Sequence, residues 1–346
     1  MDSAAELELK PADALRDRFL EALEGVWPEG VDVGEGDASV EAGRAVPLGI
    51  AVSGGPDSTA LLMLAAAALP GRVEAATVDH GLRAANAEEA EQVALLCRRL
   101  GVPHRTLPVN VAPGNVQDAA RQARYAALRD WAQERGLGAV ATAHHADDQA
   151  ETLIMRLNRA SGVAGLAGAR PRATVPGSRI PLLRPLLSWR RAELAQFVAH
   201  AGVPTADDPS NRDDRFDRAR LRKALVGADW LDPAALAASA RHIADADAAL
   251  SWSAELEYKA RVKREPFGVT YKPMAPRAIA LRVVARVVAE LTGEEPRGGT
   301  VARLFDSLVA GRPATIGELV VRPNAGGWSF ARAPARRVAP RRKDAG

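Results

Sequence analysis

The chain has 346 residues and a net charge of +3, with 47% hydrophobic and 26% charged residues, which is an ordinary globular composition. Its length predicts two folded domains rather than one. Only 4% of the residues are aromatic, which argues against the broad base-stacking platforms of single-strand-binding proteins. The single cysteine, Cys97, excludes an intrachain disulfide and a cysteine-ligated iron–sulfur cluster, and its apolar helical surroundings predict a small buried side chain.

The first twenty residues carry acidic side chains and lack a continuous apolar core, and no uncharged apolar run reaches the roughly 18 residues of a membrane span. We therefore expect a cytoplasmic protein without a membrane partner. Basic residues concentrate between Arg212 and Lys223 and between Arg336 and Lys343. These are candidate phosphate contacts, and the alternative is solvated charge on exposed faces.

Apolar residues at helical spacing over 11–24 predict a helix, and the acidic, glycine-rich stretch 27–46 predicts a loop. From residue 47 onward, short apolar runs alternate with helical patterns. The runs lie at 47–52, 73–78, 104–109 and 139–143, and the helical patterns at 57–69, 86–100, 117–135 and 147–159. This alternation predicts an α/β fold with a parallel sheet, helices on both faces, and ligands at the carboxyl ends of the strands.

Residues 160–188 are rich in Gly, Pro and Arg without a clear period, so a mobile loop is expected there, followed by a helix at about 189–201. Helical patterns at 233–263 and 276–292 predict a smaller, mostly helical C-terminal domain. The expected organisation is an N-terminal segment at 1–46, an α/β domain at 47–225 and the helical domain at 226–346, with a boundary near residue 226.

The first apolar run leads directly into a short polar turn and then a helix. The turn contains Ser53, Gly54, Gly55, Pro56, Asp57 and Ser58. Glycines allow an anion to approach the backbone closely, and a helix start presents unpaired N–H groups, so the segment predicts a phosphate site built from backbone. It is neither Gly-x-x-x-x-Gly-Lys-[Ser/Thr] nor Gly-x-Gly-x-x-Gly. The alternative is a plain glycine turn in which Asp57 and Ser58 only cap the helix.

Ser-Gly-Gly-x-Asp-Ser after a strand resembles the signature of the ATP pyrophosphatases, or PP-loop enzymes, which split ATP between its α and β phosphates and adenylate a substrate. The resemblance implies a Rossmann-like fold in which residues 53–58 bind the pyrophosphate of ATP. It also implies that Asp57 helps to place Mg²⁺.

Further segments occur in the order found in the tRNA(Ile)-lysidine synthase family, which the chain resembles over about residues 47–225. They lie at 78–83, 123–128, 142–152, 156–166, 184–187 and 208–222. Ala160 and Ala219 depart from the pattern, because the family usually has Gly and Asn there. The resemblance implies an enzyme that adenylates the wobble cytidine of the CAU-anticodon isoleucine tRNA, after which L-lysine attacks C2 and expels AMP.

Three carboxylates open the helical pattern at 147–159. Asp147 and Glu151 are separated by four residues and so share one helix face, where they are candidates for binding Mg²⁺ or a cationic substrate, whereas Asp148 is expected to point elsewhere. The candidate catalytic residues are Asp57, Asp147, Asp148 and Glu151, and the candidate metal ligands are Asp57 and Asp147. The alternative is an acidic first turn that complements the helix dipole.

Three arginines are candidate tRNA phosphate contacts, namely Arg159, Arg218 and Arg222. For Arg218 and Arg222, which share one helical face, the alternative is surface ion pairing with Asp214 and Asp217.

His144 and His145 follow a predicted strand and are candidates for proton transfer or metal ligation, or else for packing and bonding to the backbone. The tryptophans Trp131, Trp189 and Trp230 are expected to be packing groups rather than base-stacking ones.

Two other functions are weighed against lysidine formation. A tRNA thiolase with the same loop needs cysteines for sulfur transfer or a cluster, and Cys97 alone is too few. A non-catalytic tRNA-binding protein of the same fold is opposed by the intact Ser53, Asp57 and Ser58. The sequence leaves open which residue deprotonates the lysine amine and which oligomeric state the protein adopts, a homodimer included.

Overall fold

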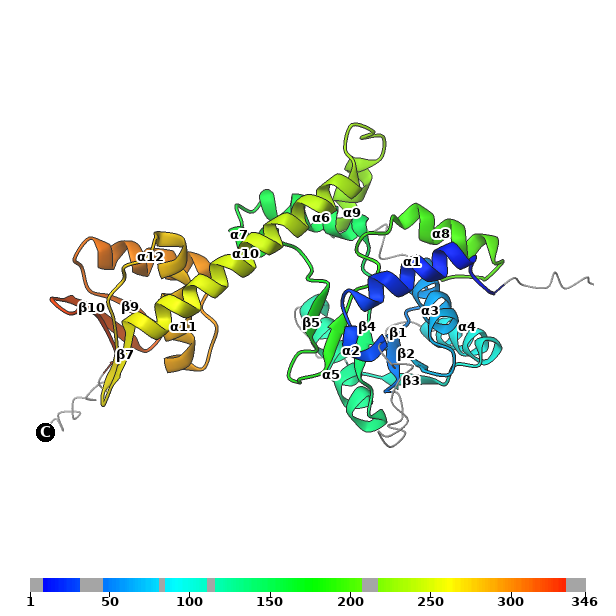
Figure 1. Cartoon of the computed structure of the whole chain (residues 1–346), viewed down its shortest axis with the longest axis horizontal. Coiled ribbons are helices and arrows are strands. Elements are labelled where there is room, and N and C mark those ends of the chain that lie inside the picture. Colours follow the sequence, from blue (N-terminus) through cyan, green and yellow to red (C-terminus); the bar gives the residue numbers. More distant parts are fainter. Residues whose placement is uncertain (1–8, 32–45, 81–84, 111–115, 207–216, 334–346) are drawn as a thin grey trace, which may run out of the picture. The chain divides into compact units, whose positions relative to one another are not determined.

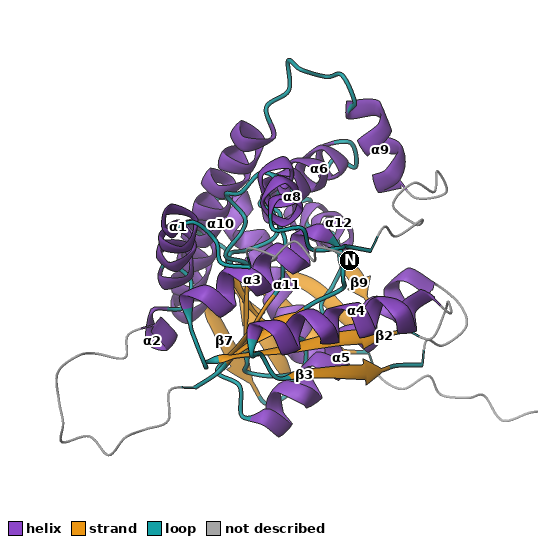
Figure 2. Ribbon diagram, turned by 90° about the vertical axis from the view of Figure 1, so that its right-hand side faces the viewer, coloured by secondary structure: helices purple, strands orange, loops and turns teal. Residues whose placement is uncertain are grey.

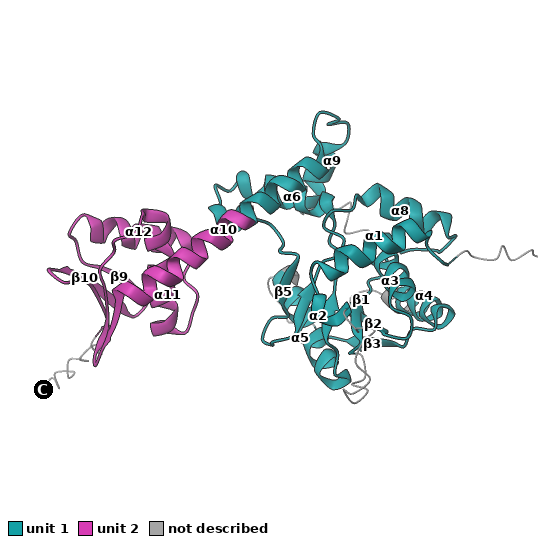
Figure 3. Ribbon diagram, viewed as in Figure 1, with its two compact units in different colours: residues 1–244 teal, residues 245–346 magenta. Residues whose placement is uncertain are grey.

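The computed structural model describes residues 9–31, 46–80, 85–110, 116–206 and 217–333. The chain divides into two compact units, Met1–Ala244 and Asp245–Gly346, which are considered separately below (Figure 3). The division falls within the long helix α10 (Pro233–Arg261), whereas the sequence placed a boundary near residue 226. The helical pattern continues without interruption through this point, so composition alone carries no mark of the division.

The first unit is built on a six-stranded sheet in the order β3-β2-β1-β4-β6-β5 (Figure 1). Five strands run parallel, and β5 pairs with β6 in the antiparallel direction at one edge. The strands are β1 (Leu48–Ala51), β2 (Val73–Asp79), β3 (His104–Pro108), β4 (Ala139–Ala141), β5 (Arg172–Thr174) and β6 (Pro181–Leu183). This is the expected Rossmann-like α/β architecture.

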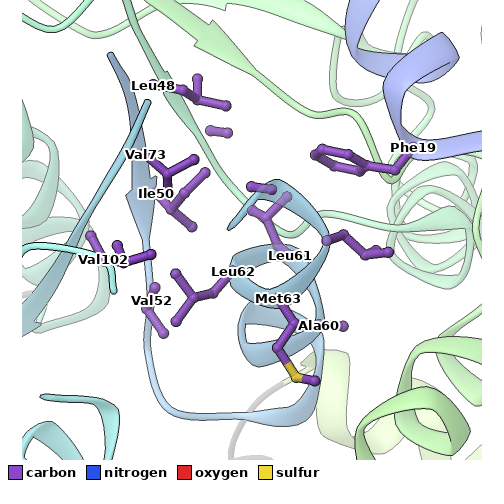
Figure 4. Close-up of a cluster of buried hydrophobic side chains, with 14 of the residues drawn as sticks. Phe19, Leu48, Ile50, Val52, Ala60, Leu61, Leu62, Met63, Val73 and Val102 are labelled. Carbon is purple, nitrogen blue, oxygen red and sulfur yellow. The ribbon is translucent and has the colours of Figure 1, made fainter. Parts of the chain in front are cut away.

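Helices cover both faces of this sheet. They are α1 (Asp13–Glu24), α2 (Pro28–Val31), α3 (Pro56–Ala68), α4 (Ala85–Leu100), α5 (Val116–Arg135), α6 (Ala146–Leu157), α7 (Val163–Leu166), α8 (Arg191–His200) and α9 (Asp217–Leu225). Successive strand residues point to opposite faces. Ala139 belongs to the core that contains residues of α1, α3 and α8, of which Figure 4 shows Phe19 and Leu62, whereas Val140 belongs to the core that contains Trp131 of α5. Each predicted strand and helix between residues 47 and 159 is present.

The segment 160–188 is not the loop that the sequence predicted. It contains α7 and the β5–β6 pair, and the side chain of Gln149 holds it to α6. The Gln149 amide donates to the Ala169 carbonyl and accepts from the Ala169 N–H, both at 2.8 Å. Gly168 has a φ of +63°, and a Cβ there would lie 2.4 Å from Gln149 Oε1. The Gln149 side chain thus adds a polar anchor to the buried apolar residues of this segment, such as Val175 and Leu183.

The second unit combines helices with a sheet. The end of α10 is followed by a five-stranded antiparallel sheet in the order β7-β8-β11-β10-β9. Its strands, orange in Figure 2, are β7 (Val262–Glu265), β8 (Gly268–Tyr271), β9 (Ala314–Ile316), β10 (Leu319–Asn324) and β11 (Gly327–Arg332), and its helices are α11 (Arg277–Thr292) and α12 (Gly298–Val309). Val287, Leu304 and Phe330 belong to its core. The sequence predicted the helices α10 and α11 but not this sheet.

No helix in the described ranges combines the length and the apolar character that crossing a membrane requires.

Candidate functional site

The turn between β1 and α3 has the backbone shape that a phosphate site requires. Gly54 has a φ of +86°, in the left-handed region that favours glycine, and its carbonyl accepts a hydrogen bond of 2.9 Å from the Ala206 N–H. Gly55 is the extended N-cap of α3, and Pro56 occupies the first turn, where its missing N–H costs nothing. The amide groups of the first turn of α3 therefore face the turn without helical partners.

Ser58 fixes this turn from inside. Its hydroxyl accepts a hydrogen bond of 3.1 Å from the Ser53 N–H and donates one of 3.0 Å to the Gly55 carbonyl. A further contact of 3.1 Å joins the Ser53 and Ser58 hydroxyl groups. Ser58 is buried and Ser53 is exposed, so Ser58 shapes the turn while Ser53 is open to a ligand.

His145 joins the carboxylates of two helix starts. Its Nε2 lies 3.4 Å from Asp57 Oδ2 on α3 and 3.4 Å from Asp148 Oδ2 on α6. His145 is also the N-cap of α6, because its Nδ1 accepts from the Asp148 N–H while the Asp148 carboxylate accepts from the His145 N–H. The other oxygen of Asp57, Oδ1, is buried and has no hydrogen-bond partner. Such an oxygen, next to a second carboxylate, fits a cation.

The charges of this cluster shift two pKa values. Burial alone lowers the pKa of His145, but its hydrogen bond to Asp57 and the charges of Asp148, Asp57 and Asp147 outweigh burial and raise the pKa above its usual value. Burial alone raises the pKa of Asp148, but the charges of His145, Arg218 and His144 outweigh burial and lower it. Asp148 is therefore ionised at neutral pH.

His144 differs from its neighbour. Burial, helped by the charges of Arg184, Arg218 and Arg121, lowers its pKa to about 4, although Asp148 opposes the shift. Its Nδ1 lies 3.0 Å from Thr142 Oγ1. His144 is thus a neutral, hydrogen-bonded imidazole at physiological pH and not a cation.

The expectation that Asp148 points away from the site is wrong. Asp148 lines the same cavity as Asp57, because its hydrogen bond of 3.2 Å with the His145 backbone turns it back toward the strand ends. Asp147 instead accepts a hydrogen bond of 2.8 Å from the Arg191 N–H and so holds the start of α8. Asp147 and Glu151 do share a face, but that face lines a different hollow.

Glu151 is buried and forms ion pairs with both arginines of α9. Its carboxylate lies 2.7 Å from Arg218 Nε and 2.5 Å from Arg222 Nε. The ion-pair alternative for these arginines is therefore present in the structure, with Glu151 as the partner. Asp217 pairs with Arg159 and Arg220, and Asp214 lies outside the described residues.

A cavity of about 240 Å³ lies at the carboxyl ends of β1, β2 and β4. Its polar side is formed by the turn at residues 53–58, which we call the phosphate turn, and by Thr142, His144, Asp148 and Arg218. Its apolar side is formed by Ala51, Ala76, Val78, Tyr125 and Leu128, and Arg121 and Arg124 of α5 also line it. Arg121 also stacks over Tyr125 at 5.0 Å. No sequence motif points to Arg121, since only the packing of α5 against the sheet brings it to the cavity.

The chain matches the family model described as the PP-loop domain over residues 38–228. A tRNA(Ile)-lysidine synthase from Novosphingobium aromaticivorans is 49% identical over 292 residues, which are 83% of this chain and 89% of that protein. Another from Zymomonas mobilis is 41% identical over 301 residues, which are 84% of this chain and 90% of that protein.

A solved structure of the U34-tRNA thiolase NcsA from Methanococcus maripaludis has a TM-score of 0.50 and 12% sequence identity, and it covers 66% of this chain and 78% of that one. That likeness shows a shared fold alone. The sequence comparisons go further, since they extend over most of the chain at high identity. The chain belongs to the tRNA(Ile)-lysidine synthase family.

Proposed function

We propose that this protein uses ATP to ligate L-lysine to C2 of the wobble cytidine of the CAU-anticodon isoleucine tRNA, forming lysidine. The observation that carries the proposal is the buried, unpartnered oxygen of Asp57 beside a backbone phosphate turn. Family membership supplies the reaction, and the Asp57 site supplies a place where ATP is bound and split.

The two sides of the cavity suit the two ends of ATP. The exposed Ser53 hydroxyl and the N–H groups at the start of α3 suit the β and γ phosphates, because a helix start favours negative charge. The apolar residues Ala76, Val78 and Leu128 suit the adenine ring. The α phosphate then lies between them, close to the carboxyl end of β4, where the cytidine must approach.

Asp57 and Asp148 are the residues that would hold Mg²⁺, which supplies positive charge against the pyrophosphate leaving group. In the described part of the chain no cluster of three or more His, Cys, Asp or Glu residues could hold a metal ion. That fits Mg²⁺, which protein sites usually bind through one or two carboxylates together with substrate phosphates. The structure favours Asp148 over Asp147 in this role, because Asp147 is occupied by the Arg191 N–H.

The lysine side chain enters as an ammonium ion with a reference pKa of about 10.4 and must lose a proton before it attacks C2. Asp148 is ionised and lines the cavity, so it attracts this ammonium group. Glu151 is already paired with Arg218 and Arg222, which again favours Asp148 among the acidic residues of α6. In this proposal the exposed Arg159 contacts a tRNA phosphate. The protein acts in the cytoplasm, where tRNA, ATP and lysine are all present.

A thiolase activity is disfavoured by Cys97. Its side chain is buried in the core between α3 and α4, and burial raises the pKa of the thiol to about 12. A thiol in that position is neither ionised nor accessible, so it does not carry sulfur to a tRNA.

A pair of transcripts tests the proposal. The protein is incubated with ATP, labelled lysine and either the CAU isoleucine tRNA or the same tRNA with uridine at the wobble position. We expect ATP-dependent incorporation of lysine into the first RNA alone. Incorporation into both RNAs, or into neither while pyrophosphate is released, would contradict the proposal.

A further inference from the structure

A second hollow, of about 710 Å³, lies next to the cavity and is not used by the steps above. It is bounded by α6, the start of α8, the end of α9 and the turn that leads into α10, and Figure 1 shows α6 beside α9. We call it the α9–α10 hollow, and it is lined by Asp147, Ala150, Glu151, Arg190, Arg191, Arg222, Leu225, Val226, Gly227, Ala228, Asp229, Leu231, Asp232 and Pro233. Its position makes it the neighbour of the reaction site.

Trp230 lies in the turn that borders this hollow, between the lining residues Asp229 and Leu231. Its side chain is 80% exposed, whereas Trp131 and Trp189 are 2% and 1% exposed. The expectation that Trp230 packs in a core, as the other two do, is therefore wrong. Val226, four residues earlier, lines the hollow and is 83% exposed, so an indole and an apolar side chain are both exposed in the short connection between α9 and α10. An indole in that setting suits a flat, amphipathic partner.

The hollow is connected to the cavity by two helices. On α6, Asp148 lines the cavity while Asp147 and Glu151 line the hollow. On α9, Arg218 lines the cavity and Arg222, one turn later, lines the hollow. One helical turn advances about 5.4 Å, so the hollow begins a short distance from the cavity along α9. A strand that follows α9 from the cavity reaches the hollow within one helical turn.

We infer that Trp230 stacks on the base of an anticodon-loop nucleotide adjacent to the wobble cytidine. This inference rests on the proposed function, because it takes the cytidine to approach the α phosphate of ATP at the carboxyl end of β4. Arg191 at the start of α8 suits the phosphate of that nucleotide, whereas Arg190 is already paired with Asp147 and Asp232. The carboxylate of Asp229 suits the amino group of a base edge. A single indole matches the low aromatic content, since one splayed base needs one ring.

The test measures binding of a fluorescein-labelled anticodon stem-loop of the CAU isoleucine tRNA to the full-length protein. Trp230→Ala is compared with Trp230→Phe and with the control Leu95→Ala, whose side chain on α4 is 52% exposed and lines neither the cavity nor the hollow. Each variant is also measured with two stem-loops that carry an abasic site on the 5′ or the 3′ side of the cytidine. Loss of a base stack corresponds to about 5- to 150-fold in affinity.

We expect Trp230→Ala to weaken binding of the intact stem-loop by about tenfold or more, with Trp230→Phe retaining most of the affinity and Leu95→Ala unchanged. One of the abasic stem-loops should bind the wild type as weakly as the intact stem-loop binds Trp230→Ala, and the alanine variant should lose nothing more on it. In turnover, Trp230→Ala should raise KM for tRNA and leave KM for lysine unchanged.

Wild-type affinity in Trp230→Ala would overturn the inference, as would an equal loss on every stem-loop. A higher KM for lysine would assign Trp230 to lysine entry and would also overturn the inference. A changed oligomeric state with unchanged RNA binding would assign Trp230 to contact between two copies of the chain, with the same consequence. Lysidine formation by the wild type is measured in parallel. If it is absent while the binding results hold, the proposed function fails separately from the stacking of Trp230.

Discussion

At the scale of single residues, Asp57 carries the central role in the proposed reaction. It lies in the first turn of α3, where an ionised carboxylate is favoured by the helix dipole, yet one of its oxygens is buried without a partner. An unpaired buried acceptor costs free energy, and a carboxylate pays that cost only where a ligand compensates for it. Ser58 and His145 hold the surrounding atoms in place, so the site is formed before any substrate arrives.

Replacement of Asp57 by Asn should abolish adenylation. The amide keeps the shape of the side chain but loses the charge that holds Mg²⁺, so the rate of tRNA-dependent pyrophosphate exchange into ATP should fall by about 100-fold or more. Binding of tRNA should stay within a few-fold of wild type. Asp130→Asn, in an exposed ion pair with Arg129 on α5, is the matched control and should exchange normally. Normal exchange in Asp57→Asn would remove the metal role.

The depressed pKa of His144 predicts a pH dependence of stability. The unfolded chain binds a proton at His144 with a pKa of about 6.5, whereas the folded chain does so only near pH 4, so protonation favours unfolding. The free energy of unfolding contributed by this group is therefore fully present above about pH 6.5 and is lost as the pH falls toward 4. Urea unfolding at a series of pH values should show that the free energy of unfolding of His144→Asn falls less steeply over that window than that of the wild type. Parallel wild-type and variant curves would contradict the shifted pKa.

The residues of the site differ in how far the sequence could predict them. Residues 53–58 are contiguous, so one motif in a strand–turn–helix context identified the whole phosphate turn. The orientation of Asp147 and Asp148 was beyond such reasoning, because it depends on the reciprocal capping bonds between Asp148 and His145. The exposure of Trp230 was equally hidden, since a turn residue next to an apolar leucine has the same local pattern whether it packs or not.

At the scale of elements, α6 organises the site. Its first turn supplies Asp148 to the cavity, its second supplies Glu151 to the arginines of α9, and Gln149 between them anchors the residues after α7. Two segments distant in sequence, α9 and the residues after α7, are thus held by neighbouring side chains of one helix. The predicted strands and helices up to residue 159 followed from contiguous apolar runs, whereas this anchoring depends on single polar contacts that no periodicity shows.

The attachment of α9 predicts a stability effect. Glu151 is buried, and removal of both Arg218 and Arg222 would leave its charge without compensation, which costs about 3–5 kcal/mol in comparable buried pairs. The double variant Arg218→Ala, Arg222→Ala should lose free energy of unfolding on that scale, and adding Glu151→Gln should restore much of it.

The salt dependence of tRNA binding distinguishes the ion pairs of Arg218 and Arg222 with Glu151 from the tRNA phosphate contacts that the sequence predicts for these arginines. If the two arginines contact phosphates, the double variant should flatten the log–log slope by roughly 0.7–0.9 for each contact. A flatter slope with unchanged stability would contradict the ion-pair account and return both arginines to the RNA.

The anchor at Gln149 predicts the behaviour of the segment from Arg159 to Arg179. Its two hydrogen bonds to Ala169 should keep the wild-type segment resistant to limited proteolysis whether or not tRNA and ATP are present. Gln149→Ala should be cut quickly within the segment, and Gln92→Ala, at an exposed position on α4, serves as the control. Fast cleavage of the free wild type and protection by the substrates would instead support the mobile loop that the sequence predicted.

At the scale of the whole molecule, the candidate site lies in the first of the two compact units. The first unit holds the phosphate turn, the cavity and the α9–α10 hollow, and the second has its own core and sheet. We propose the second unit as a tRNA-binding domain. The β strands of the second unit could not be predicted from the sequence, because they have only three to six residues and several carry charged side chains, as in Val262–Glu265. Helix α12 had a readable signal in Val301, Leu304, Phe305 and Leu308 that was missed.

The most direct test of the central claim is the identity of the modified nucleoside. The full-length protein is incubated with ATP, Mg²⁺, isotope-labelled lysine and the CAU isoleucine tRNA, and the RNA is then digested to nucleosides and analysed by mass spectrometry. The account predicts a cytidine that carries the labelled lysine, formed by the wild type and absent with Asp57→Asn. A reaction in which ATP is consumed but the wobble cytidine is recovered unmodified, or carries sulfur in place of lysine, would contradict it.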